Sequence, residues 1–238
     1  MQGVEQLEVD EGFGGGTIDH RLAGDSLIRE IHGSKDIKLS SLHPRGAVLF
    51  FEGQQARGVY VLHSGRAKVL ISSSEGKVLI LRIAEAGNLL GLNSALKGSP
   101  YDATVETLEP CRTDFISRTD FIALLDRSKK ARIGVSEALS SELTELVEHA
   151  RSLLLPKSTR EKLARLLLRW CDASEEARPE GIRVNPGLTH EEIAQMICAS
   201  RETVTRLFAE LKRKRIVSLA HNAIFVRNRK ALESLLCG

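Results

Sequence analysis

The sequence predicts an α+β fold in which a small β-domain comes first, a long helix follows, and a helical domain with a β-hairpin ends the chain. Glycines recur between residues 46 and 98 with short apolar runs between them, which is typical of strands and turns. Apolar residues between 139 and 153 follow helical spacing. Residues 189–213 contain two helix starts separated by a short turn. The 238 residues are 42% hydrophobic, enough to bury a core in one large domain or two small ones.

Composition argues against a membrane or secreted protein. Apolar runs such as "VLILRIA" are far shorter than the roughly 18 residues of a membrane span. The N-terminus lacks the basic start and apolar core of a signal peptide. The four cysteines lie far apart with no C-x-x-C pair, so the sequence predicts reduced thiols, no disulfide and no metal site. We therefore expect a cytoplasmic protein with no membrane partner.

The β-domain is expected over residues 21–127, after a lead-in at residues 1–20. The lead-in contains "EGFGGG" and has no periodicity, so we expect it to be mobile. The runs "AVLFF", "GVYVLH", "AKVLIS" and "KVLILRIA" then alternate with glycines. "SSSEGK" suits a hairpin loop in which Gly76 adopts a positive φ. Such even spacing favours a small barrel or roll.

Residues 128–156 are predicted to form a dimerisation helix and a hinge. Five residues at spacings of 4, 3, 4 and 3 make a narrow apolar seam about two heptads long: Leu139, Leu143, Leu146, Ala150 and Leu153. A seam of this width favours a partner helix and hence a homodimer. The alternative is that the stripe packs on its own β-domain, and the pattern leaves it open. Pro156 ends the helix because proline has no N–H to donate.

Basic charge is concentrated in residues 157–238. This segment has 16 Lys/Arg against 10 Asp/Glu, whereas residues 1–156 have 18 against 21. A basic segment attracts polyanions such as nucleic acid, although a charge bias is also common on a solvated surface.

Two helix starts within this segment have the spacing of a helix-turn-helix. Thr189 and Glu192 form the pattern of a capping box, and Ser200 is placed to cap a second helix after a turn of about three residues. The second helix has an apolar stripe at i, i+3, i+4 and i+7 that must face a core: Val204, Leu207, Phe208 and Leu211. Beyond it, "RIVSLAHNAIFVRN" predicts two strands that form a wing.

The outward face of the second helix suits base recognition. Arg201 lies in its first turn, and the wheel turns three more charged residues away from the core: Glu202, Arg206 and Arg213. An arginine can donate two hydrogen bonds to guanine, and a glutamate can accept one from cytosine. This combination therefore favours reading G·C pairs in a major groove.

The stretch "THEEIAQMICASRETVTRLFAELKRKRIV" closely resembles the winged helix-turn-helix of the Crp/Fnr family of bacterial transcription regulators. Upstream, "LHPRGAVLFFEGQQARGVYVLHSGRAKVLISSSEGKVLILRIAEAGNLLGLNSAL" is similar to the family's cyclic-nucleotide-type domain, so the resemblance covers roughly residues 35–230. It implies a double-stranded β-helix (a jelly-roll-like β-roll), a long dimerisation helix and a winged helix-turn-helix over residues 157–238. It also implies a homodimer that binds a pseudo-palindromic site on double-stranded DNA and contacts RNA polymerase.

The resemblance assigns DNA contacts residue by residue. The base-reading positions fall on Arg201, Glu202 and Arg206, which implies half-sites resembling TGTGA. The positions assigned to DNA phosphates are Thr189, His190, Ser200, Thr203 and Arg213. Cys198 stands where the turn usually carries glycine. If that position needs a positive φ, Cys198 stores strain on the order of 1 kcal/mol.

The effector pocket that the resemblance implies departs from the family pattern. It comprises Leu90, Gly91, Leu92, Asn93, Tyr101, Asp102 and Ala103. Leu92 stands where a cyclic-nucleotide binder has a glutamate for the ribose, and Tyr101-Asp102 stands where it has Arg-Ser for the phosphate. A buried phosphate would lack its charge partner and meet Asp102 instead. The effector is expected to be an unknown small molecule or absent, and cyclic AMP is argued against.

Other activities fit the sequence less well. An iron-sulfur sensor of this family needs an N-terminal cysteine cluster, but the first cysteine is Cys111. Haem would need a histidine such as His63, which as a lone strand histidine is more simply structural. "HEEIA" lacks the second histidine of H-E-x-x-H, and no phosphate-binding loop or nucleophile elbow is present, so no enzyme is predicted. The remaining alternative is a ligand-binding module whose C-terminal domain mediates protein contacts.

Overall fold

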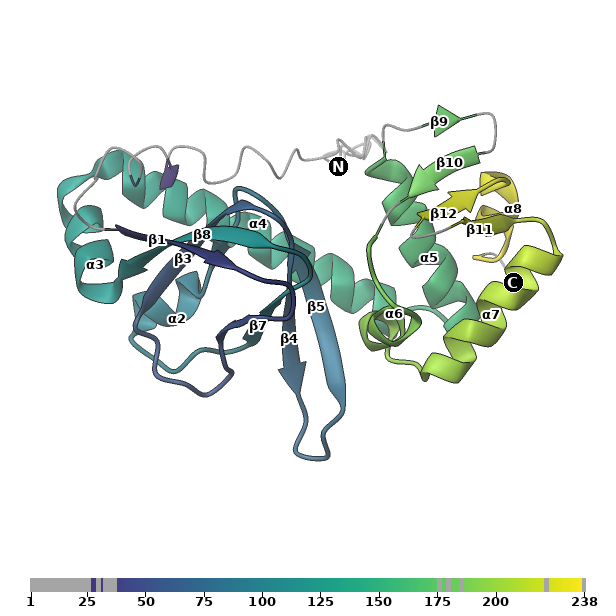
Figure 1. The fold of residues 1–238 in the computed structure, drawn as a ribbon, viewed down its shortest axis with the longest axis horizontal. Helices are drawn as coiled ribbons and strands as arrows, with labels where there is room; N and C mark the ends of the chain where they lie inside the picture. The colour runs from purple at the N-terminus through teal and green to yellow at the C-terminus, as the bar shows by residue number, and fades with distance from the viewer. Residues whose placement is uncertain are drawn as a thin grey trace, which may run out of the picture.

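The computed structural model describes residues 27, 28, 31, 38–174, 177–178, 181–184, 186–220 and 223–236. A β-roll and a smaller helical body are joined by one long helix (Figure 1). The α+β fold class is confirmed, with the roll first and the helix-turn-helix last. The predicted lead-in at residues 1–20, the wing tip at 221–222 and Cys237 lie outside the described residues.

The roll consists of two antiparallel sheets of four strands each. One sheet has the order β1-β8-β3-β6 and the other β2-β7-β4-β5. Their bounds are β1 (Lys38–His43), β2 (Val48–Phe50), β3 (Gly58–Ser64), β4 (Ala67–Ser72), β5 (Val78–Ala84), β6 (Leu89–Leu90), β7 (Thr104–Thr107) and β8 (Cys111–Ser117). Gly76 has φ 77° in the β4–β5 hairpin loop, which confirms the predicted positive φ. A short helix, α2 (Leu92–Lys97), was not predicted.

Two consecutive helices leave the roll. Helix α3 (Arg118–Arg127) is followed directly by α4 (Lys129–Leu154), whose N-cap Ser128 accepts a hydrogen bond from the Ala131 N–H at 3.1 Å. Helix α4 ends two residues before Pro156, as the sequence predicts. In Figure 1 it runs along the roll and continues to the C-terminal body. It is therefore the covalent link between the two parts.

The C-terminal body contains more strands than the sequence predicts. Its helices are α5 (Thr159–Asp172), α6 (His190–Ile197), α7 (Arg201–Arg213) and α8 (Arg229–Ser234). The predicted hairpin of β11 (Val217–Ala220) and β12 (Ala223–Val226) is extended by β10 (Gly181–Val184) and β9 (Ala177–Arg178) into a sheet of order β11-β12-β10-β9. The two added strands are too short to show an alternating pattern, and they are stabilised by pairing, as in Ile182 opposite Val226.

The β4–β5 ribbon joins the cores of the two bodies. Leu70 on β4 and Ile80 on β5 are 8% and 0% exposed and belong to the same apolar cluster as Val204 and Phe208 of α7. Strand β5 also lies against α6. The helix-turn-helix is therefore packed on the roll of its own chain.

None of the helices in the described part of the chain has the length and apolar content that a bilayer span requires. The described residues also contain no cluster of three or more His, Cys, Asp or Glu side chains arranged for a metal ion. Cys111 and Cys171 are buried free thiols, whereas Cys198 is exposed.

Candidate nucleic-acid interface and effector cavity

Helix α6 begins with the predicted capping box. The Thr189 hydroxyl accepts a hydrogen bond from the Glu192 N–H at 3.2 Å, and Glu192 Oε2 accepts from the Thr189 N–H at 2.8 Å. The Thr189 hydroxyl also donates to Glu192 Oε2 at 2.9 Å. Thr189 itself is exposed. The N–H and the hydroxyl of Thr189 thus both donate to Glu192 Oε2, at the exposed start of α6.

The turn between α6 and α7 places Cys198 in the left-handed region. Its φ and ψ are 53° and 52°, and its N–H donates to the Ala194 carbonyl. The position therefore needs a positive φ, for which glycine is the unstrained residue. Cys198 stores strain on the order of 1 kcal/mol there.

Helix α7 presents the charged face that the wheel predicts. Ser200 caps it by accepting the Thr203 N–H at 3.2 Å, and the stripe from Val204 to Leu211 is buried. The side chains assigned to bases are all exposed: Arg201, Glu202 and Arg206. The pKa of Glu202 lies below its ordinary value because its own backbone N–H and Ser200 hydrogen-bond to it and Arg201 is nearby. Ser200 is thus the cap of α7, and Glu202 is an exposed carboxylate in its first turn.

The positions assigned to phosphates surround the start of each helix. The ring of His190 stacks on Phe208 with centroids 5.0 Å apart, and its Nδ1 lies 3.0 Å from Thr205 Oγ1. Ser200 Oγ donates to Thr203 Oγ1 at 3.0 Å. Ser200 is exposed and Thr203 is half-buried. Local hydrogen bonds thus orient these side chains, while Arg213 is an exposed cation at the other end of α7.

Sequence reasoning missed two cations beside the wing. Arg215 is exposed and has φ 55°, so the chain turns sharply between α7 and β11. Arg227, after β12, donates from Nε to Ser218 Oγ at 3.0 Å, which holds it across the hairpin. The basic run "LKRKR" at residues 211–215 could have indicated Arg215 from the sequence. Arg227 could be found only once the hairpin was paired.

A cavity of 490 Å³ lies between the roll and α4. Its apolar wall comes from both parts: Val69, Leu81, Leu92, Ala103, Leu139, Leu143 and Leu146. Polar groups are contributed by Arg82, Asn93, Asp102 and Glu142. Of the seven residues predicted for the effector pocket, five line this cavity: Gly91, Leu92, Asn93, Asp102 and Ala103.

The other two predicted pocket residues lie in the core of the roll. Leu90 is 1% exposed and Tyr101 is 3% exposed, and neither lines the cavity. Tyr101 stacks on Phe50 with ring centroids 3.8 Å apart, and its hydroxyl donates to the Gly58 carbonyl at 2.8 Å. A Cβ at Gly91 would lie 2.5 Å from the Tyr101 ring. Tyr101 therefore replaces a polar position of the family with a fixed core aromatic residue.

The charges that face the cavity are already paired. Arg82, which sequence reasoning missed, donates to Glu142 Oε1 at 3.1 Å and to Asn88 Oδ1 at 3.0 Å. Asn93 Nδ2 donates to Asp102 Oδ2 at 2.8 Å. Arg82 is the only cation among the lining residues, and its partner Glu142 neutralises it. The lining therefore has a net negative charge and suits a phosphate poorly.

The predicted seam on α4 is partly exposed and partly turned toward the roll. Leu143 and Leu146 are 63% and 36% exposed, and Ala150 is exposed. Leu139 packs against the core of the roll, and Leu153 is half-buried. Leu139 therefore packs on the β-domain of its own chain, which is the alternative considered for the stripe, while Leu143 and Leu146 remain accessible to a partner helix.

His63 has a structural environment. Its Nε2 lies 2.9 Å from Asp114 Oδ2, and the two side chains are 10% and 3% exposed. Asp114 also accepts a hydrogen bond from the hydroxyl of Ser40. This buried pair supports the structural interpretation over a haem ligand.

Comparison with known proteins places both parts of the chain. Residues 42–128 match the cyclic nucleotide-binding domain, and residues 161–235 match the Crp-like helix-turn-helix domain. The chain belongs to the Crp/Fnr family of transcription regulators. The global nitrogen regulator of Synechococcus elongatus is 26% identical over 210 residues, which cover 87% of this chain and 94% of that protein. The anaerobic regulatory protein of Bacillus subtilis is 25% identical over 183 residues, or 76% of each chain.

The fold is shared with solved structures of the same family. The structure of FixK2 from Bradyrhizobium japonicum superposes with a TM-score of 0.71 at 19% identity, covering 84% of this chain and 97% of that one. This Crp/Fnr chain is therefore a transcription regulator with a helix-turn-helix DNA-binding domain. Its family consists of transcription regulators rather than enzymes.

Proposed function

We propose that this Crp/Fnr regulator binds a pseudo-palindromic operator as a homodimer, with α7 of each protomer in successive major grooves about 34 Å apart. Arg201, Glu202 and Arg206 read base edges in half-sites that resemble TGTGA. Phosphates are held by Thr189, His190, Ser200, Thr203 and Arg213. The observation that carries the proposal is the exposed Arg/Glu/Arg face of α7 on a helix whose opposite face is buried.

The dimer is proposed to form through α4. Leu143 and Leu146 expose apolar surface on a 26-residue helix, and burying it against the same surface of a second copy is favourable. Ala150 and Leu153 continue this stripe toward the hinge. Because α4 leads into the C-terminal body, a fixed seam sets the separation of the two recognition helices.

The 490 Å³ cavity is proposed as the effector site, for a small molecule other than a cyclic nucleotide. Leu92 has no polar atom for a ribose hydroxyl, Tyr101 is stacked in the core, and Arg82 is paired with Glu142. An apolar wall with paired charges suits a largely apolar, uncharged or cationic molecule. Cyclic AMP is therefore expected to leave DNA binding unchanged.

The test is selection of DNA sites from a random pool, with the purified full chain, followed by affinity measurements at several salt concentrations. We expect selected sites with two-fold symmetry, and an affinity that falls steeply as salt rises because bound phosphates release counterions. Native mass spectrometry of the same sample identifies any retained small molecule. Failure to enrich any sequence, or a salt dependence no steeper than that of a protein contact, would contradict the proposal.

A further inference from the structure

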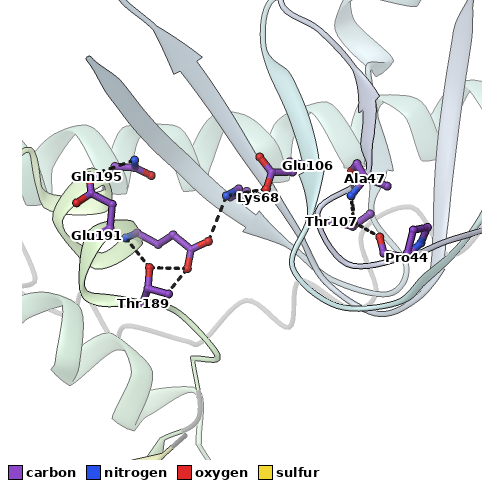
Figure 2. Close-up of polar contacts among 9 residues, drawn as sticks. Pro44, Ala47, Lys68, Glu106, Thr107, Thr189, Glu191 and Gln195 are labelled. Atoms are coloured by element: carbon purple, nitrogen blue, oxygen red, sulfur yellow. Dashed lines mark hydrogen bonds and ion pairs between the residues drawn. The ribbon is translucent and has the colours of Figure 1, made fainter. Parts of the chain in front are cut away.

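The side chain of Lys68 connects the roll to the first helix of the helix-turn-helix. Its Nζ lies 3.0 Å from Glu106 Oε1 on β7 and 3.1 Å from Glu192 Oε1 on α6. The side chains of Lys68 and Glu192 are only 12% and 11% exposed. Figure 2 shows Lys68 reaching from the sheet, beside Glu106, toward the turn of chain that carries Thr189. This ion pair is therefore a shielded contact between two domains.

Glu192 holds Lys68 with one oxygen and Thr189 with the other. Its Oε2 accepts the N–H and the hydroxyl of Thr189 at 2.8 and 2.9 Å. Burial pushes the pKa of Glu192 up, but hydrogen bonds from Thr189 and Lys68 outweigh it, so the pKa lies below its ordinary value. The group is thus a carboxylate at neutral pH, directly behind a residue assigned to a DNA phosphate.

That carboxylate would oppose a phosphate unless its charge were offset. Like charges repel more strongly where water is excluded, and Glu192 is mostly shielded. Lys68 supplies a positive charge 3.1 Å away, which Glu192 shares with Glu106 at 3.0 Å. Neighbouring contacts keep it there, because Leu70 is buried in the C-terminal core and Arg66 Nη1 donates to the Pro186 carbonyl at 3.0 Å.

We propose that Lys68, a residue of the β-roll, is a positioning residue for the DNA phosphate contact at Thr189. It offsets part of the charge of the carboxylate that caps α6, because it also pairs with Glu106, and it holds the start of that helix against the roll. The inference rests on the proposed phosphate contact of Thr189. It means that the DNA-binding surface is completed by a side chain from the other domain.

The same strand also faces the effector cavity. Val69, the neighbour of Lys68 on β4, lines the cavity, and successive strand residues point to opposite faces. Val69 therefore lines the cavity, while its neighbour Lys68 points to the other face and contacts α6. A ligand that shifts Val69 would act directly on Lys68.

The experiment compares Lys68→Met with Lys77→Met in the full chain. Lys77 lies on the same β4–β5 ribbon, but it is 83% exposed and pairs only with the exposed Glu75 among the ion pairs of the described residues. Both variants lose one positive charge. Lys68→Met is expected to bind the selected duplex and a scrambled duplex roughly 3- to 10-fold more weakly, because the loss is at a phosphate. Lys77→Met should stay within about twofold of the wild type on both.

A double variant tests the role of the Glu192 charge that Lys68→Met leaves without its lysine partner. In Lys68→Met/Glu192→Gln, the amide oxygen of glutamine can still accept the Thr189 N–H but has no charge. Binding should recover to within about threefold of the wild type. Lys68→Arg, which keeps the positive charge, should also bind nearly as the wild type does.

Two further measurements separate positioning from misfolding and from a failure of the proposed function. Trp170, the only tryptophan, lines a cleft between the bodies beside Arg66 and Ile83, so its fluorescence reports whether the domains stay docked. Amide exchange over residues 189–193 should be faster in Lys68→Met than in Lys77→Met without DNA. If the wild type binds DNA but Lys68→Met and Lys77→Met bind with the same affinity, this inference alone is overturned. A folded double variant that binds DNA as weakly as Lys68→Met would also overturn it. A wild-type chain that binds no DNA would overturn the proposed function instead.

Discussion

The start of the helix-turn-helix has both caps that the sequence pattern predicts, whereas the cavity beside α4 lacks both polar groups that the family resemblance assigns to a cyclic nucleotide. Thr189 and Ser200 make their cap hydrogen bonds at 3.2 Å each. In the roll, Leu92 is an apolar wall residue, and Tyr101 is stacked on Phe50.

The difference reflects what each region must recognise. A DNA duplex presents the same phosphate spacing to any regulator, so the hydrogen bonds at the helix starts suit every member. A small-molecule site needs only one shape and one set of partners, and these can be replaced without changing the surrounding sheet. The predictions below test the two regions and the elements that join them.

The largest effect is expected where the cavity and the proposed seam meet. Leu143→Asp together with Leu146→Asp should give monomers and reduce operator affinity by roughly a hundredfold or more, because each half-site then binds alone. Analytical ultracentrifugation and titration of the selected duplex measure both effects. Ile133→Asp, an exposed position on α4 outside the heptad pattern, is the matched control. A double variant that remains a dimer would remove the seam from the proposal.

A buried histidine on α4 should make the stability of the fold depend on pH. His149 is 5% exposed, and burial and then Arg169 lower its pKa to about 4 from an ordinary value of 6.5. The unfolded chain therefore binds the extra proton first, and stability is lost as pH falls from about 6.5 to about 4, by up to about 3 kcal/mol. Urea unfolding at several pH values measures this. His149→Leu should lose less stability than the wild type over the same range, and parallel curves would show that His149 has no such role.

Base reading is tested on α7. Arg206→Ala should weaken binding to the selected half-site by roughly 1 to 3 kcal/mol and relax the preference at one base pair. Arg213→Ala, which removes a proposed phosphate contact, should weaken matched and scrambled duplexes equally. Fluorescence anisotropy with both duplexes compares the two. An equal loss for Arg206→Ala on scrambled DNA would place Arg206 among the phosphate contacts.

The smallest effect concerns the turn. Cys198→Gly should raise the free energy of unfolding by up to about 0.5 kcal/mol, because glycine relieves about 1 kcal/mol of strain and the freer unfolded chain offsets about half of that or more. Cys198→Ala removes the thiol but keeps the strain, so it should gain nothing. Thermal unfolding of both variants distinguishes conformation from thiol chemistry. A stabilised Cys198→Ala would show that the thiol itself is the unfavourable group.

Sequence reasoning predicted the features that depend on neighbours in the chain. Helix caps and the buried stripe of α7 follow from residues within one or two turns, whereas the positive φ at Cys198 was only a condition that the family resemblance raised. The missed features join distant segments. Lys68 and Glu192 are 124 residues apart, and Arg82 and Glu142 are 60 apart. Strands β9 and β10 were missed because pairing with β12, rather than an alternating pattern of their own, stabilises them.

Leu139, Leu143 and Leu146 of the proposed seam also line the proposed effector cavity, so occupancy of one surface is expected to change the energy of the other. If α4 pairs with a second copy, ligand binding in the cavity and dimerisation become linked equilibria. Both then depend on protein concentration. The effector should bind with an apparent affinity that rises with protein concentration. A titration at nanomolar protein and one at micromolar protein would then report different dissociation constants for the same molecule.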